Sequence, residues 1–235
     1  MPQETGTRTP PHRWPVHAAA RNTHARVLEV VRAHCGPLAG ARIVDLPCGA
    51  GAFSRDLLAL GADVVPADLA RNEPFLGDPG AWLKADANAR LPFADASVDA
   101  FVSIEGIEHF ENPSFFLREC HRVLRPGGTL VLSTPNVDSF RSRRSMFTHG
   151  YHRYFNPVSA AARDSGHLHA IDMVFMRGLI RDLDLEVLEI TVNRAKRRWY
   201  YDLLRPWLTR RLPRDMRGVV PFYGEVIIYA LRKRG

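Results

Sequence analysis

The chain has 235 residues, which is enough for one large α/β domain with a full core and too few for two. No apolar stretch follows a basic start, and no window approaches about eighteen uninterrupted apolar residues, so neither a signal peptide nor a membrane span is expected and a cytoplasmic protein is indicated. The three cysteines form no Cys-x-x-Cys pair, which is typical of free thiols in a reducing compartment.

The net charge of +7 is concentrated in two segments. Residues 194–217 hold nine basic residues against two aspartates, and residues 137–163 hold five arginines against one aspartate. The rest of the chain is therefore mildly acidic. Neither basic segment has a strong helix or strand pattern. Arginine favours planar anions, although a genome rich in G and C would produce the same arginine bias.

Taken in chain order, the apolar pattern predicts alternating helices and strands. Helices are expected over 17–34, 53–60, 113–124 and 171–183. Strands are expected over 42–46, 63–67, 81–85, 98–104, 129–134, 185–192 and 223–231. Such alternation requires parallel crossovers, but no helix fits in the usual way between the last two strands. We therefore expect a doubly wound α/β domain with a seven-stranded sheet, mostly parallel, with an antiparallel last strand.

The stretch Val44–Gly51 is the part of the chain around which the rest is organised. An apolar run with an acid at Asp45 is followed by Cys48, Gly49 and Gly51, which indicates a strand, a tight turn and the start of a helix. Such a turn aims free backbone N–H groups at a ligand, and glycine permits close approach. A plain strand-to-helix connection would have the same pattern, so the turn alone does not decide the function.

Acidic residues recur where the predicted strands end, namely Asp45, Asp68, Asp86 and Glu105. Ligands of open parallel sheets bind beyond the carboxyl ends of the strands. Asp68 lies 17 residues after Gly51, close to the offset of roughly 20 at which an acid accepts ribose hydroxyls in this architecture. The pattern predicts a nucleoside site.

The motifs resemble those of class I S-adenosylmethionine-dependent methyltransferases, over about residues 40–192 and the final strand. Four stretches are similar to the branch of this family that includes ubiquinone-biosynthesis O-methyltransferases. They are 103–113 (SIEGIEHFENP) at the end of the strand expected over 98–104, 121–128 (HRVLRPGG), 133–136 (STPN) and 166–169 (GHLH). This resemblance implies a Rossmann-like fold with S-adenosyl-L-methionine as cofactor. The cofactor-binding residues that it implies are Asp45, Cys48, Gly49, Gly51, Asp68, Leu69, Asp86, Ala87, Ile104 and Glu105.

Pro47 departs from the family pattern, because it stands where the family usually has its first glycine. Proline lacks an N–H group and fixes φ, so the turn has to keep its shape without that donor. This substitution bears on cofactor affinity rather than on the fold.

His109 is the candidate general base if the methyl acceptor is a hydroxyl, because an imidazole takes up a proton near neutral pH. A helix cap or packing beneath a substrate loop is the structural alternative for this residue. His167 and His169, with His149 and His152, suggest a metal, but no carboxylate or cysteine is spaced to complete a site. We therefore expect no metal.

The whole chain, 1–235, is expected to be one methyltransferase domain. Residues 1–40 would form an N-terminal segment and helix, residues 41–136 the cofactor-binding half, and residues 137–170 and 193–222 basic lid insertions over the site. On the substrate side we expect Tyr151, Arg153, His167 and His169. The lid favours an anionic small-molecule acceptor, such as a phosphorylated, carboxylated or uronic-acid-bearing one, or a lipid-linked or saccharide metabolite.

Residues 196–212 carry aromatic and leucine side chains at intervals of four among arginines. This pattern is typical of an interfacial helix on an anionic membrane, although the same side chains would also suit packing on the domain. Two other functions are the alternatives, a nicotinamide oxidoreductase and a non-enzymatic RNA-binding protein. A nicotinamide oxidoreductase is disfavoured because 48–51, CGAG, lacks the third glycine of the dinucleotide fingerprint. A non-enzymatic RNA-binding protein is disfavoured because no stacking platform for single strands is recognisable.

Overall fold

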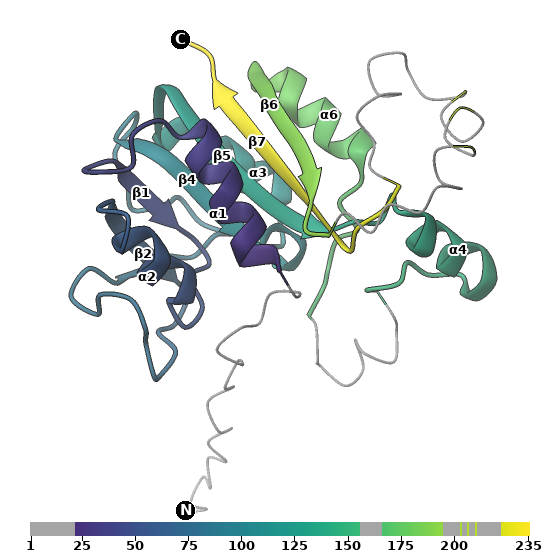
Figure 1. Ribbon diagram of the computed structural model, residues 1–235, viewed down its shortest axis with the longest axis horizontal. Helices are drawn as coiled ribbons and strands as arrows, with labels where there is room; N and C mark the ends of the chain where they lie inside the picture. The colour runs from purple at the N-terminus through teal and green to yellow at the C-terminus, as the bar shows by residue number, and fades with distance from the viewer. Residues whose placement is uncertain (1–21, 156–165, 195–202, 204–205, 207–209, 211–221) are drawn as a thin grey trace, which may run out of the picture.

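The computed structural model describes residues 22–155, 166–194, 203, 206, 210 and 222–235 (Figure 1). Its centre is a seven-stranded sheet with the strand order β3-β2-β1-β4-β5-β7-β6. The strands are β1 (Arg42–Asp45), β2 (Asp63–Asp68), β3 (Leu83–Lys84), β4 (Val98–Ile104), β5 (Leu124–Pro135), β6 (Leu185–Val192) and β7 (Val226–Lys233). The expected seven-stranded α/β architecture is confirmed.

Helices cover both faces of the sheet. They are α1 (Thr23–His34), α2 (Ala52–Leu58), the 3-10 helix η1 (Ile107–His109), α3 (Pro113–Val123), α4 (Phe140–His149) and α6 (Met173–Asp182). Side chains from α1 and α2, among them Val27 and Phe53, form one apolar core with one face of the strands. Side chains from α3 and α6, such as Phe116 and Met176, form a second apolar core on the other face.

Local sequence explains where these helices begin. Asn112, Ser139 and Asp172 precede α3, α4 and α6, and each side chain accepts a hydrogen bond from a backbone N–H of the first turn. Short polar side chains at this position satisfy donors that have no partner inside the helix. Pro113 stands at the first position of α3, where a missing N–H costs nothing.

The direction of the strands places their carboxyl ends together. β1 pairs in parallel with β2 and with β4, and β4 pairs in parallel with β5. β7 lies between β5 and β6 and is antiparallel to both, as Figure 1 shows by its arrow. The expectation of an antiparallel last strand is confirmed. One edge of the sheet therefore collects the loops that follow β1, β2, β4 and β5.

Two sequence expectations were wrong. β5 begins at Leu124 rather than at residue 129, because Leu124 pairs with Val98 before a register shift in β4. The basic segment after β5 contains a helix, α4, although its apolar pattern is weak; the Ser139 cap and the left-handed Gly150 at its end define it.

In the described part of the chain, no helix is both long and apolar enough to cross a membrane.

Candidate functional site

The carboxyl edge of the sheet holds the acidic residues that the sequence predicted. Asp45 and Asp68 are the last residues of β1 and β2, and Glu105 directly follows β4. Asp86 lies two residues beyond β3. Open parallel sheets bind ligands beyond this edge, so it is the candidate site (Figure 1).

Asp68 joins the second strand to the glycine turn. The backbone N–H of Gly49 donates to its Oδ2 at 2.9 Å, and the N–H of Leu69 donates to its Oδ1 at 2.7 Å. Burial raises the pKa of Asp68, and hydrogen bonds from Gly49, Leu69 and Ala70 oppose that rise. An ionised carboxylate has about four acceptor sites, so about one is left for a ligand hydroxyl. The carboxylate is thereby fixed in orientation before any ligand arrives.

The two glycines of the turn have different surroundings. Both have positive φ, 53° at Gly49 and 75° at Gly51. A Cβ at Gly49 would meet nothing within 4 Å, whereas a Cβ at Gly51 would lie 2.6 Å from the Phe75 ring and 2.7 Å from the Gly77 nitrogen. The backbone N–H of Leu76 also donates to the Ala50 carbonyl at 2.8 Å. Gly51 is therefore required by the loop that packs over α2, and the open approach to the turn is at Gly49.

Asp45 lies beneath the turn rather than in it. Its side chain is 1% exposed, and the Ser54 hydroxyl donates to Oδ2 at 2.6 Å. Burial raises its pKa to about 7, and the nearby Asp68 charge adds to that rise, while the Ser54 hydrogen bond opposes it. Asp45 thus ties the end of β1 to the first turn of α2. Ser54 was not singled out from the sequence, because only the fold brings it to Asp45.

Pro47 is accommodated by a glycine from another strand end. The Leu46–Pro47 peptide is cis, and a Cβ at Gly106 would overlap the Cδ of Pro47. The turn keeps its connection to β2 through the Cys48 N–H, which donates to the Ala67 carbonyl at 2.9 Å. The pairing of Pro47 with Gly106 was not foreseen from the sequence, because these residues are adjacent only where β1 and β4 end.

The other predicted cofactor residues fall into exposed and buried groups. Leu69 is 59% exposed, and Asp86 is exposed with its Oδ1 accepting from the Asn88 N–H at 2.8 Å. Ala87 and Ile104 are buried, at 6% and 8% exposure. The Cys48 thiol is also buried, and burial beside Asp45 and Asp68 raises its pKa above the usual value, so it is unsuited to act as a nucleophile. Leu69 and Asp86 therefore offer the accessible surface at this end of the edge.

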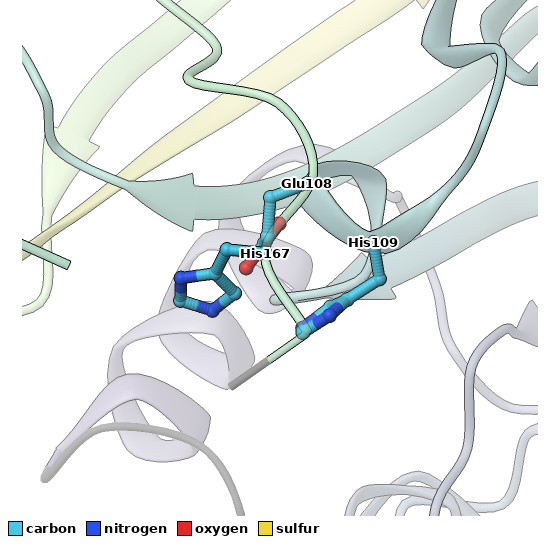
Figure 2. A group of neighbouring side chains, drawn as sticks. All are labelled: Glu108, His109 and His167. Carbon is cyan, nitrogen blue, oxygen red and sulfur yellow. The ribbon is translucent and has the colours of Figure 1, made fainter. Parts of the chain in front are cut away.

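A carboxylate and two imidazoles gather beyond β4 (Figure 2). Glu108 and His109 are consecutive residues of η1, and His167 comes from the segment that precedes α6. One ligand atom from each lies within 4.8 Å of the others. The Glu108 backbone carbonyl accepts from the N–H groups of Leu168 and His169, at 2.8 and 3.1 Å, which fixes the two segments together. The fold thus supplies a carboxylate for the histidines that sequence spacing did not reveal.

Burial sets the protonation of this cluster. Glu108 is fully buried, and its pKa is raised to about 8 by burial, with a further rise from Glu105. Burial and the neighbouring His167 lower the pKa of His109 to about 4, and burial lowers that of His167. Both imidazoles are therefore neutral at pH 7. The role of His109 as a general base stays a prediction, and so low a pKa makes it a weak base.

The remaining substrate-side residues lie near this cluster or on the segment that follows α4. Tyr151 and His169 are half-buried, and Arg153 is exposed with its guanidinium 5.7 Å from the Tyr154 ring.

Within α4, Arg141 pairs with Glu225 at 3.2 Å and Arg143 pairs with Asp138 at 2.9 Å. Part of the basic charge of this segment is thus used to fix α4 on the domain. Of the two expected lid insertions, 137–170 and 193–222, residues 156–165 and most of residues 195–221 lie outside the described residues, so the lid stays a prediction.

Arg122, in the run 121–128, HRVLRPGG, has a structural explanation. Its guanidinium bonds both oxygens of Glu119, at 2.9 and 2.7 Å, and the carbonyls of Leu91 and Phe93. It also bonds Asp95 at 2.6 Å. Arg122 therefore fastens the connection between β3 and β4 to α3, away from the carboxyl edge.

Comparison with known proteins agrees with this geometry. The family described as "Methyltransferase domain" matches residues 44–132, from the end of β1 into β5. A ubiquinone biosynthesis O-methyltransferase of Xanthomonas oryzae is 36% identical over 110 residues, which cover 42% of this chain and 45% of that protein. A demethylmenaquinone methyltransferase of Clavibacter sepedonicus is 38% identical over 133 residues, covering 52% and 51%. The chain thus aligns with about half the length of these relatives.

Solved structures extend the likeness to nearly the whole fold. An S-adenosylmethionine-dependent methyltransferase from Mesorhizobium loti has a TM-score of 0.56 at 19% identity, covering 87% of this chain and 96% of that one. A second, from Archaeoglobus fulgidus, has a TM-score of 0.58 at 17% identity, with coverages of 89% and 92%. At such identities the likeness concerns the fold alone.

Proposed function

The chain has the class I S-adenosylmethionine-dependent methyltransferase fold, and its residues 44–132 belong to the methyltransferase domain family; on this premise we propose that the protein transfers a methyl group from S-adenosyl-L-methionine to a small-molecule acceptor. The observation that carries the proposal is Asp68 at the end of β2, held by the Gly49 N–H beside an open turn. An acid in this position suits a ribose hydroxyl.

The residues at the carboxyl edge fit such a cofactor. Asp68 would accept a ribose hydroxyl, Leu69 and Asp86 would border the base, and the turn at Gly49 would face the amino acid part. S-adenosylmethionine would supply a methyl group on a positively charged sulfur, and the carboxylates of this edge favour a cation. The leaving sulfur departs neutral, so no acid is needed. The chain's main task is to hold the acceptor in line, and such positioning can contribute about 7–11 kcal/mol.

The acceptor is proposed to be an oxygen nucleophile on an anionic small molecule. Support for oxygen comes from the matched relative whose name is an O-methyltransferase of ubiquinone biosynthesis, and the name demethylmenaquinone methyltransferase also refers to a quinone. Support for negative charge comes from the arginine-rich segments after β5 and β6, from which Arg153 is exposed beside Tyr154. A carboxylated or lipid-linked hydroxyaromatic compound combines these features.

Calorimetric titration with S-adenosylhomocysteine, and with NAD as the comparison ligand, tests the cofactor. Saturable binding of the first and no binding of NAD is expected. A radiolabelled methyl assay then compares carboxylated hydroxyaromatic acceptors with their neutral methyl esters, and the acids are expected to react faster. Binding of NAD alone would overturn the proposal, and equal rates for acid and ester would overturn the anionic acceptor.

A cytoplasmic location and peripheral contact with an anionic membrane stay predictions. The segment 196–212 that motivates the membrane contact lies outside the described residues except at Leu203, Pro206 and Arg210. Retention of the protein by vesicles with acidic headgroups at low salt would support the contact, and its absence would contradict it.

A further inference from the structure

Phe75 lies against the turn that follows β1, although it is distant from that turn in the sequence. It belongs to the segment 69–82, which connects β2 to β3 and which the structure describes throughout without a helix. A Cβ at Gly51 would lie 2.6 Å from one ring atom of Phe75 and 2.8 Å from another. The ring therefore occupies the space that a side chain at Gly51 would fill, at the start of α2.

A second glycine encloses the ring from within the same segment. A Cβ at Gly77 would lie 2.9 Å from Cε1 of Phe75 and 3.4 Å from the Cβ of Ser54. Phe75 is half-buried between Gly51 and Gly77, where neither neighbour has a side chain to move aside. A displacement of the 69–82 segment would therefore be felt directly at the turn.

Backbone hydrogen bonds join the turn to the same part of the chain. Three N–H groups are involved: Cys48 donates to the Ala67 carbonyl at 2.9 Å, Gly49 to Oδ2 of Asp68 at 2.9 Å, and Leu76 to the Ala50 carbonyl at 2.8 Å. By contrast, α2 begins at Gly51 with no side-chain cap. Glycine has more backbone freedom than other residues, so a turn with two glycines needs outside contacts to keep one shape.

We propose that Phe75 is a positioning residue that holds the turn 48–51 in the shape that receives the cofactor. A Cβ at Gly49 would meet nothing within 4 Å, so the turn is open there, whereas Phe75 closes it at Gly51. A site that already has its bound shape loses less conformational entropy when a ligand binds. Phe75 acts through Gly51 and needs no contact with the cofactor. Its effect on cofactor binding rests on the proposed function, whereas its effect on the turn does not.

Calorimetric titration with S-adenosylhomocysteine compares Phe75→Ala with the unaltered protein. Without the ring we expect the fraction of molecules with a receptive turn to fall to about a tenth, and the apparent affinity therefore to fall about 10-fold. Phe75→Met keeps an apolar side chain that is flexible enough to fill the same space, so it should recover most of the affinity. Gly77→Ala should also weaken binding, because its Cβ would displace the ring.

Phe93→Ala is the matched control. Phe93 is half-buried as well, and it packs against the apolar core that contains α3 and α6. The variant loses the same phenyl ring and the packing that goes with it, but the turn keeps its contacts. It should bind S-adenosylhomocysteine like the unaltered protein.

Amide hydrogen exchange without ligand measures the turn itself. In Phe75→Ala, exchange at the N–H groups of Gly49 and Leu76 is expected to be accelerated more than exchange at Leu46. The Leu46 N–H donates to the Val102 carbonyl at 3.0 Å, between the ends of β1 and β4. A loss of global stability alone would accelerate exchange at Leu46 as well, whereas local opening of the turn would not.

Unchanged affinity in Phe75→Ala would overturn the role of Phe75, as would an equal loss in Phe93→Ala or equal acceleration of exchange at Gly49 and Leu46. If Phe75→Ala does not fold, Gly77→Ala takes its place in both measurements. Faster exchange at Gly49 in a protein that does not bind S-adenosylhomocysteine would overturn the methyltransferase proposal alone.

Discussion

The N–H of Gly49 donates a 2.9 Å hydrogen bond to Oδ2 of Asp68, which connects the turn after β1 to the carboxyl end of β2. Asp68 therefore has two tasks, because the same carboxylate that would bind a ligand also shapes the turn that receives it.

Asp68→Asn is expected to weaken binding of S-adenosylhomocysteine by roughly 10- to 100-fold, because an amide NH₂ group would face a backbone N–H and the charged acceptor is lost. Calorimetric titration measures the affinity. Asp63→Asn at the exposed first residue of β2 is the matched control and should bind normally. Equal affinities of the two variants would show that Asp68 does not contribute to the cofactor site.

Gly51→Ala is expected to destabilise the fold more than Gly36→Ala. Both glycines have positive φ, 75° and 72°, so alanine costs about 1–2 kcal/mol of backbone strain at each. A Cβ at Gly36 meets nothing within 4 Å, whereas a Cβ at Gly51 overlaps Phe75 and Gly77, which adds about 1–3 kcal/mol. Urea denaturation measures the difference. Equal losses would mean that the 75–77 loop does not pack on the turn.

Asp45→Asn is expected to change the pH dependence of stability. The folded-state pKa of Asp45 is raised to about 7 from 3.8, so between about pH 4 and 7 the folded state binds more protons than the unfolded state. Stability contributed by Asp45 therefore falls as pH rises, by at most about 1.4 kcal/mol per pH unit, and asparagine cannot titrate.

Denaturation of both proteins from pH 4 to pH 8 checks this sign. The free energy of unfolding of the variant, relative to the unaltered protein, should rise up to about pH 7 and stay constant above it. The difference cancels the contributions of His109, His121 and His167, whose pKa values are lowered and which act in the opposite direction. A relative stability that falls with pH would contradict the raised pKa.

Arg122→Ala is expected to lower stability by about 2–4 kcal/mol, because it leaves the Glu119 carboxylate without its charged partner and removes the side-chain donor from the carbonyls of Leu91 and Phe93. Arg122→Lys should recover only part of this loss, since an ammonium group lacks the planar fork. Arg118→Ala, exposed on the same helix, is the control and should cost little. Thermal unfolding distinguishes the three variants.

Much of the fold could be predicted from the sequence, because its elements have strong local patterns. β4 and β6 have the bounds that their apolar runs indicated, and the positions of Asp45, Asp68 and Glu105 at strand ends followed from where those runs stop. Helix α4 was missed because a serine cap and a terminal glycine define it, with little apolar pattern to signal it.

The candidate site was predictable only where its residues are close to one another in sequence or strand order. Gly49 was indicated by the glycine turn, and Asp68 by its place 17 residues after Gly51. Phe75 above Gly51, Pro47 against Gly106 and His167 beside Glu108 join segments whose separation in the chain carries no such signal. These contacts arise from side-chain packing between loops.

The sequence by itself determined the alternation of strands and helices, the acids at the strand ends and the resemblance to methyltransferases, because hydrophobic periodicity and short motifs are local properties. Only the tertiary structure decided that Glu108 is fully buried and that His167 lies beside it and His109. Burial and the electrostatic field around a group depend on which distant segments pack against it, and those segments are brought together by the sheet.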